Sequence, residues 1–352
     1  MKRLKYFDTV KGIGILLVVL GHATFVNERL LTFIFSFHMP LFFIVSGMLT
    51  AYKDGAGSTL RDVFYRKLKT IIIPYLCFSI CYTLIDILSV YFGQISLNDL
   101  KINLVCTGSF AGSGPLWFLP TLFICEIIFN VLLKKTGKKY GIIISLIISL
   151  TGFLIWHFFE PVYTASKSDL TKFFLLSFIF VIIRSMVCLI FLALSYTLFK
   201  IAKVFSGDDI KGYALPVLSG VILLIICAVL SGLNTNIDIH NMDFGNIILF
   251  LLNAFCGSVG LILICRIIPE VKALKVIRFW GKNSLIIMAT HLNFYILFLG
   301  NVIAYKINPY IKHAKEYVLL FNIMLITMAV ETLFIFLINR YIPWMSGKSK
   351  NK

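Results

Sequence analysis

The amino-acid sequence predicts an all-α, polytopic integral membrane protein with about ten transmembrane helices. Apolar residues make up 59% of the 352 residues and charged residues only 14%, whereas soluble domains are close to half apolar and a quarter charged. The mean hydropathy is +0.93. Most of the chain also falls into apolar runs of about 20 residues, the length that a helix needs to cross about 30 Å of hydrocarbon.

Ten such runs follow one another along a single predicted domain, residues 1–352. They cover residues 10–26, 30–52, 70–92, 116–133, 140–159, 173–199, 213–231, 247–268, 284–304 and 318–342. Each run is expected to form one membrane-spanning helix, because few charges interrupt it. The first run ends near Gly21-His22-Ala23, which resembles a signal-peptide cleavage site. Its length, the acidic Asp8 before it and the nine later runs predict instead that it remains the first helix.

The basic residues are unequally distributed between alternate connections. If both termini are cytoplasmic, 25 of the 33 Lys and Arg residues lie on the cytoplasmic side and 7 on the outer side, with Arg184 inside a span. The positive-inside rule therefore predicts cytoplasmic termini. The net charge of +17 is explained by this topology and by attraction to anionic lipid, so nucleic acid is not expected as a partner.

The cysteines and common motifs exclude several other classes. The eight cysteines are scattered singly, and only Cys106 lies outside the predicted spans. The sequence therefore predicts neither a disulfide framework nor a metal site. It also contains no phosphate-binding glycine loop, no dinucleotide-binding fingerprint and no internal repeat.

A few ionisable residues lie inside the predicted spans, away from the span ends. They are His22, His38, Asp86, Glu126, Arg184, His291 and Glu331. Ionisable groups are costly in hydrocarbon, so each is a candidate functional residue. The alternative for each is a buried polar contact between helices.

The stretch DTVKGIGILLVVLGH, residues 8–22, places a cation and an imidazole in register. Eleven helical residues rotate by about 1100°, some 20° beyond three turns, and rise about 16.5 Å. Lys11 and His22 are therefore expected on one helix face, with Lys11 at the cytoplasmic edge and His22 in the outer half of the bilayer. His38 is expected at a similar depth on the next helix, which suggests a shared polar site. Close approach of helices or a ligand is permitted by Gly12, Gly14 and Gly21.

Several blocks resemble one known family. Asp8-x-x-Lys11-Gly12, Gly21-His22 and FHMPLFFIVSG (37–47) resemble the opening signature of the acyltransferase-3 membrane proteins, in particular the fucose 4-O-acetylase-like polysaccharide O-acetyltransferases. The resemblance continues, in order and over nearly the whole chain, through YRKLKTIIIPYL (65–76), GPLWFLPTLFICE (114–126) and WGKNSLIIMATH (280–291). Many members carry Arg where this chain has Lys11, so the bidentate guanidinium fork is absent here.

The resemblance implies transfer of an acyl group, usually acetyl, from cytoplasmic acetyl-CoA to a hydroxyl of a cell-surface or capsular polysaccharide sugar. Acyl-CoA is then the donor substrate, and no bound cofactor is expected. The acceptor would be a glycan or a lipid-linked sugar, and polysaccharide biosynthesis proteins are candidate partners. The expected location is a cell membrane, in particular the bacterial cytoplasmic membrane.

The chemistry that the resemblance implies assigns roles to the two histidines. A hydroxyl that attacks a thioester needs a general base with a pKa near neutrality, and histidine suits this task best. His22 is predicted to be that base, with acylation of its imidazole as the alternative. His38 is predicted to orient His22 or the acceptor.

The remaining candidates are expected to bind substrate. Asp8 and Lys11 lie where an anionic part of CoA could be met, although Asp8 could equally cap the first helix and pair with Lys11. Arg66, Lys67 and Lys69 could contact the CoA phosphates, or could form a solvated cluster on the cytoplasmic side.

Trp117 could line the acceptor entrance or be an ordinary interfacial tryptophan. Glu126 and Arg184 are expected to form an ion pair, ahead of a catalytic role. His291 is included through the last motif. Two other classes stay open: a transporter or flippase for a lipid-linked sugar, which would use similar buried charges and broken helices, and a non-catalytic sensor or scaffold.

Overall fold

The computed structural model describes residues 4–53, 58–205, 214–235, 237–267, 274–307 and 316–348. Regular structure in these residues is helical, apart from one isolated bridge between Asp238 and Asp243. This confirms the all-α prediction. Residues 213 and 268, where two predicted spans begin and end, and parts of the basic segments fall outside the described residues.

The chain forms two compact units. Unit 1 consists of Met1–Val45 and Ile201–Leu337, and unit 2 of Ser46–Lys200 and Ile338–Lys352. Residues of both units belong to α2 (Glu28–Lys53), α8 (Leu170–Phe205) and α14 (Glu316–Tyr341). The units are described separately below.

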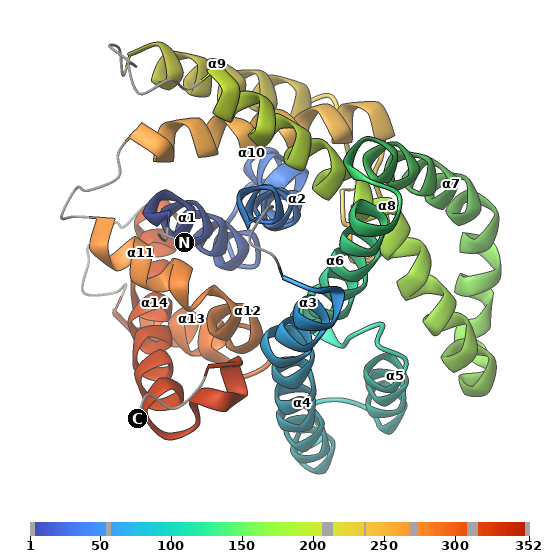
Figure 1. Ribbon diagram of the computed structural model, residues 1–352. Helices are drawn as coiled ribbons and strands as arrows, with labels where there is room; N and C mark the ends of the chain where they lie inside the picture. The colour runs from blue at the N-terminus through green and yellow to red at the C-terminus, as the bar shows by residue number, and fades with distance from the viewer. Residues whose placement is uncertain are drawn as a thin grey trace. The chain divides into compact units, whose positions relative to one another are not determined.

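Unit 1 contains most of α2 and α14 together with six further helices. These are α1 (Lys5–Gly21), α9 (Ala214–Ser231), α10 (Ile247–Ile267), α11 (Lys275–Lys282), α12 (Ser284–Thr290) and α13 (Ile296–Ile307). Helices α9 and α10 lie side by side, and α1 packs against α10, α11 and α12 (Figure 1). Gly220 and Gly260 face each other where α9 meets α10, since a Cβ on either would lie 2.8 Å from the carbonyl oxygen of the other.

The contact between α1 and α11 requires two glycines. A Cβ on Gly12 would collide with the carbonyl oxygen of Ile277, and one on Gly281 would collide with that of Asp8. Helix backbones approach this closely only where small residues meet. The contact joins the first sequence block of the chain to the block that begins at Trp280.

Unit 2 contains most of α8 and a series of shorter elements. They are α3 (Leu60–Lys67), the π-helix η1 (Leu68–Ile72), α4 (Ile73–Tyr91), α5 (Leu97–Gly108), the 3₁₀ turn η2 (Gly114–Trp117), α6 (Phe118–Lys135), α7 (Lys138–Ala165), the 3₁₀ turn η3 (Ser166–Ser168) and the 3₁₀ turn η6 (Pro343–Ser346). Helix α6 packs against α7, α3 and η1, while α4 packs against α5 and η6.

The π-helix η1 has an identifiable cause in the sequence. Pro74 lacks a backbone N–H, and its ring crowds the carbonyl four residues earlier, so the regular hydrogen-bond ladder cannot continue through it. The Ile73 N–H bonds to the Leu68 carbonyl, five residues back. The chain nevertheless stays helical from α3 through α4, and Arg66 and Lys67 lie immediately before the π-turn.

Within the described residues, seven helices are long and apolar enough to cross a membrane, judged by length and composition. They are Glu28–Lys53, Leu60–Tyr91, Gly114–Lys135, Lys138–Ser168, Leu170–Lys200, Ile247–Arg266 and Glu316–Tyr341. Leu215–Ser231 and Ile296–Ile307 are shorter apolar helices. The chain is therefore a multi-pass membrane protein, while the number of spans and the side of the termini stay predictions.

Two predicted spans differ from the structure in ways that affect the histidines. Helix α1 ends at Gly21, so His22 caps its C-terminus and does not lie about five residues inside it. The run 284–304 is not one helix, because α12 ends at Thr290 and α13 begins at Ile296. Tyr295 has φ 57°, a left-handed conformation that separates the two helices.

Candidate functional site

His22 is an accessible imidazole at the C-terminal end of α1. Its backbone N–H donates to the Val19 carbonyl at 3.2 Å, and the residue is exposed. Gly21 before it leaves room for Phe35, whose ring would lie 3.0 Å from a Cβ at that position. A helix C-terminus carries partial negative charge, which favours a cation there. A positive charge that develops on His22 is therefore stabilised by the helix that carries it.

His291 lies at the corresponding end of α12, but it is fully buried. Its Nδ1 lies 2.9 Å from the Ile287 carbonyl oxygen and 3.0 Å from that of Met288. Carbonyl oxygens only accept hydrogen bonds, so the ring proton must be on Nδ1 and the lone pair on Nε2. Among the residues that the structure describes, buried Nε2 has no hydrogen-bond partner.

The structure brings these two imidazoles together. The ring centroids of His22 and His291 are 5.4 Å apart, with an angle of 38° between the ring planes. His38 is buried as well, and its Nδ1 donates to the Ile34 carbonyl at 2.8 Å. Phe35 lies between His22 and His38, with ring centroids 6.0 Å and 4.9 Å away respectively. The sequence anticipated His38 as the neighbour of His22, yet the imidazole in ring contact with it is that of His291.

The segment that carries His291 is attached to α14 at two points. Thr290 donates its hydroxyl to Oε2 of the buried Glu331 at 2.7 Å. Trp280 donates Nε1–H to the Thr332 hydroxyl at 3.0 Å. These side-chain bonds hold α11 and α12 against α14 and so fix the backbone next to His291.

Asp8 and Lys11 lie on α1, in the same unit as the histidines. Their side chains are 3.7 Å apart, and Asp8 is buried while Lys11 is partly exposed. Asp8 belongs to the first turn of α1, whereas the N-cap position is Leu4. Of the alternatives for Asp8, pairing with Lys11 is therefore correct and capping of the helix is wrong.

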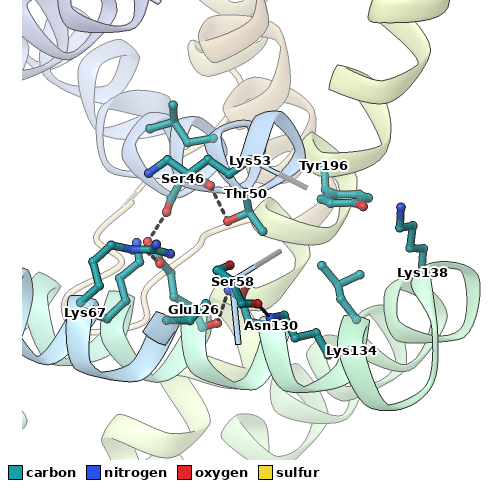
Figure 2. A pocket seen from close by; sticks show the side chains of 14 residues that line it. Ser46, Thr50, Lys53, Ser58, Lys67, Glu126, Asn130, Lys134, Lys138 and Tyr196 are labelled. Carbon is teal, nitrogen blue, oxygen red and sulfur yellow. Dashed lines mark hydrogen bonds and ion pairs between the residues drawn. The ribbon is translucent and has the colours of Figure 1, made fainter. Parts of the chain in front are cut away.

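Unit 2 contains a separate basic cavity of about 320 Å³. Five cations and one acid are among its lining residues: Lys53, Arg66, Lys67, Lys134, Lys138 and Glu126. Figure 2 shows Lys67, Glu126 and Ser46 together at one side of the cavity, with Lys138 at the other. The excess of positive charge suits an anionic ligand that carries several charges.

Glu126 is the buried acid of this cavity. It forms an ion pair with Lys67 and accepts a hydrogen bond from the Ser46 hydroxyl. The predicted pair between Glu126 and Arg184 is therefore wrong. Lys67 reaches Glu126 because α3 packs against α6 just before the π-turn.

Arg184 is fully buried. Its guanidinium lies 4.8 Å from the ring centroids of both Trp117 and Phe180. Its Nε donates to the Thr121 hydroxyl at 3.0 Å, and one terminal nitrogen donates to the Ala111 carbonyl at 2.8 Å. Trp117 is only 6% exposed, so it packs against Arg184 and does not line an open entrance.

Sequence reasoning missed several residues of these two groups. Lys53, Lys134 and Lys138 were interpreted only as charges that set the topology, although they line the cavity. Ser46 was part of the motif FHMPLFFIVSG without a role of its own. A signal for the lysines was present in KKTGKK, a dense basic turn at residues 134–139.

A comparison with known families gives one match. The sequence model of a family described as an acyltransferase domain, acyltransferase-3, matches residues 4–340, which is nearly the whole chain and covers most of each unit. No curated protein and no solved structure matches the chain significantly.

Proposed function

Because the chain belongs to the acyltransferase-3 family, and is thus a membrane acyltransferase, we propose that its donor is acetyl-CoA and its acceptor a sugar hydroxyl. The acceptor sugar belongs to a cell-surface or capsular polysaccharide or to its lipid-linked precursor. The protein acts in a bacterial cytoplasmic membrane. The family match supports the acyl transfer, and the fucose 4-O-acetylase-like motifs in the sequence support the sugar acceptor.

The observation that carries the proposal is the exposed imidazole of His22 beside the buried imidazole of His291. In the proposed reaction His22 takes the proton from the acceptor hydroxyl while the hydroxyl oxygen attacks the thioester carbonyl carbon. A C–O bond forms and the C–S bond breaks. The proton passes from His22 to the departing thiolate, which leaves as free CoA, so His22 is neutral again at the end of the cycle.

The basic cavity of unit 2 supports the choice of a CoA donor. CoA carries several phosphate charges, and the cavity has a surplus of cations. Arg66, Lys134 and Lys138 are the proposed phosphate contacts. Lys67 already neutralises the buried Glu126, so its first role is to balance that charge. Lys11 is a further candidate for donor binding.

His22→Ala tests the proposal directly. Removal of the base should lower the rate of acetyl transfer by about 10²–10⁴-fold and leave acetyl-CoA affinity unchanged. The measurement is acetyl-CoA-dependent acetylation of sugar acceptors by the purified protein in liposomes, with donor affinity determined separately. His157→Ala, at an exposed position on α7, is the matched control for loss of an imidazole. Undiminished transfer by His22→Ala would eliminate His22 as the base.

One observation favours a second function. The helix interrupted between Thr290 and Ile296 is the kind of broken span found around transporter binding sites. A transporter for a lipid-linked sugar would move its substrate across liposomes without acetyl-CoA. Transport without any acetyl transfer by the unaltered protein would make this second function correct.

A further inference from the structure

A general base must present an unprotonated nitrogen to its substrate. A neutral imidazole carries its single proton on either ring nitrogen, and the hydrogen bond that one nitrogen makes decides which nitrogen is left as the base. His22 is exposed at the end of α1, so backbone packing alone does not select its tautomer. An acceptor fixed beside the ring of His22 would make that selection.

Nε2 of His291 has the properties of such an acceptor. The two carbonyl contacts of Nδ1 hold the proton on that nitrogen, so Nε2 can only accept a hydrogen bond. No described residue gives the buried Nε2 a partner, an unfavourable state for a polar atom unless a donor reaches it. The ring of His22 is 5.4 Å away between centroids. A centroid separation of 5.4 Å is compatible with an N–H···N distance of about 3 Å between the two rings.

His38 fits this role less well. Its Nδ1 is also held by a backbone carbonyl, but the ring that it contacts is that of Phe35. Phe35 in turn contacts His22, so this aromatic ring lies beside both imidazoles. Ring contact with His22 and a buried Nε2 without a partner among the described residues are combined in His291.

We propose that His291 is the positioning residue for His22. Nε2 of His291 accepts the N–H of one His22 nitrogen, which leaves the other nitrogen unprotonated toward the acceptor hydroxyl. During transfer the hydroxyl proton moves to that second nitrogen, so His22 becomes an imidazolium, and His291 stays neutral throughout. The arrangement follows the logic of base and orienting group known from hydrolase triads, with a neutral imidazole as the orienting group.

The local backbone keeps His291 ready for this task. The two carbonyls that receive Nδ1–H belong to the last turn of α12, and that of Ile287 also accepts the backbone N–H of His291 at 3.0 Å. The bond from Thr290 to Glu331 holds the neighbouring residue against α14. The imidazole of His291 is therefore held through Nδ1, and the lone pair on Nε2 points in one fixed direction.

This inference rests on the proposed acetyl transfer, and three substitutions of His291 test it. His291→Gln keeps an acceptor oxygen near the position of Nε2. His291→Asn keeps a donor near the position of Nδ1 but has no acceptor at Nε2, and His291→Leu has neither. We expect the Asn and Leu variants to lose about 10–100-fold in kcat, the Gln variant to regain most of this, and the acetyl-CoA affinity to stay constant.

A double-mutant cycle separates positioning from structural damage. In a His22→Ala background, His291→Asn should cause no further loss, because the group that it orients is already absent. Equal losses for the Gln and Asn variants, or losses that multiply with that of His22→Ala, would overturn the role of His291. Melting temperatures of all variants show whether each one folds. If the Leu variant does not fold, the comparison between the Gln and Asn variants tests the role of His291.

A readout without catalysis keeps the two proposals apart. In protein labelled with ¹⁵N-histidine, the NMR chemical shifts of the His22 ring nitrogens should show one hydrogen-bonded N–H. This hydrogen bond should be lost in His291→Asn and present in His291→Gln. If the unaltered protein transfers no acetyl group, the proposed function fails and this spectrum still tests the hydrogen bond. If acetyl transfer occurs and the ¹⁵N chemical shifts of His22 do not change when His291 is substituted, only the positioning role is refuted.

Discussion

Removal of the positive charge of Lys67 should destabilise the protein, because it leaves the carboxylate of Glu126 buried without its counter-charge. The Glu126 side chain is 2% exposed and that of Lys67 is 21% exposed. Breaking a fully buried ion pair costs 3–5 kcal/mol, and the partial exposure of Lys67 lets water reach the carboxylate after truncation, so we expect about 2–3 kcal/mol for Lys67→Met. This corresponds to a fall in melting temperature of roughly 5 °C.

A second substitution should reverse most of this loss. Glu126→Gln in the Lys67→Met background removes the unpaired charge, and the amide oxygen can still accept the bond from the Ser46 hydroxyl. The second substitution should reverse at least half of the fall in melting temperature that Lys67→Met causes. The assay is thermal unfolding of the purified protein in detergent at fixed protein and lipid concentrations, because bound ligands also shift melting.

Arg66→Met is the matched control on the same helix. Arg66 lines the same cavity but is exposed, and the described part of the chain holds no ion pair to it. Its removal should leave the melting temperature within about 1 °C and weaken acetyl-CoA binding about 3–10-fold, less so at high salt. A Lys67→Met protein that melts like the unaltered one would refute the buried pair. Unchanged donor affinity in Arg66→Met would refute the assignment of the cavity to the donor phosphates.

Three further predictions concern packing, topology and a helix cap. Gly12→Ala should destabilise the protein by about 1–3 kcal/mol, because the added methyl group collides with the Ile277 carbonyl, and an unchanged melting temperature would contradict this packing. Reporter fusions at both termini and in the turn at residues 134–139 should report the cytoplasm, and an outer location for any of them would overturn the predicted orientation. In α5, hydrogen bonds from the Ser96 side chain and backbone hold the pKa of Asp99 below its ordinary value of 3.8. This contribution is present above pH 3.8 and is lost as the pH falls through the lower pKa of the folded state. Ser96→Ala should therefore reduce amide protection in α5 at neutral pH, and the difference from the unaltered protein should shrink in acid, where the bond from the Asp99 N–H to the Ser96 hydroxyl remains. Equal protection at neutral pH would show that the cap does not stabilise α5.

The fold could be predicted from hydrophobic periodicity and length, and the places where this failed have physical reasons. Apolar runs such as 30–52 and 173–199 became helices with similar bounds, because in hydrocarbon a helix is the only local structure that satisfies every backbone group. The run 284–304 contains no sequence signal for the end of a helix at Thr290. Its first half holds neither Pro nor Gly, and Tyr295, which adopts the left-handed conformation, is a residue rarely found there.

The candidate site was predictable in its residues but less so in its pairings. An ionisable residue inside a span can be found from sequence alone, because its cost in hydrocarbon does not depend on its partner. Its partner depends on which helices pack together, and that is tertiary information. Glu126 was therefore expected beside Arg184 and is paired with Lys67, while Arg184 is held by neutral oxygens and by the rings of Trp117 and Phe180.

The interruption at His291 connects the fold to the proposed chemistry. A helix that stops inside a membrane protein exposes the carbonyls of its last turn, and these need partners from the protein itself. At the end of α12 the imidazole of His291 supplies such a partner to the Met288 carbonyl through Nδ1–H. The same bond forces the lone pair onto Nε2, beside the exposed ring of His22 at the end of α1. The contact of Nδ1 with the Met288 carbonyl at the end of α12 therefore also sets the orientation proposed for the base.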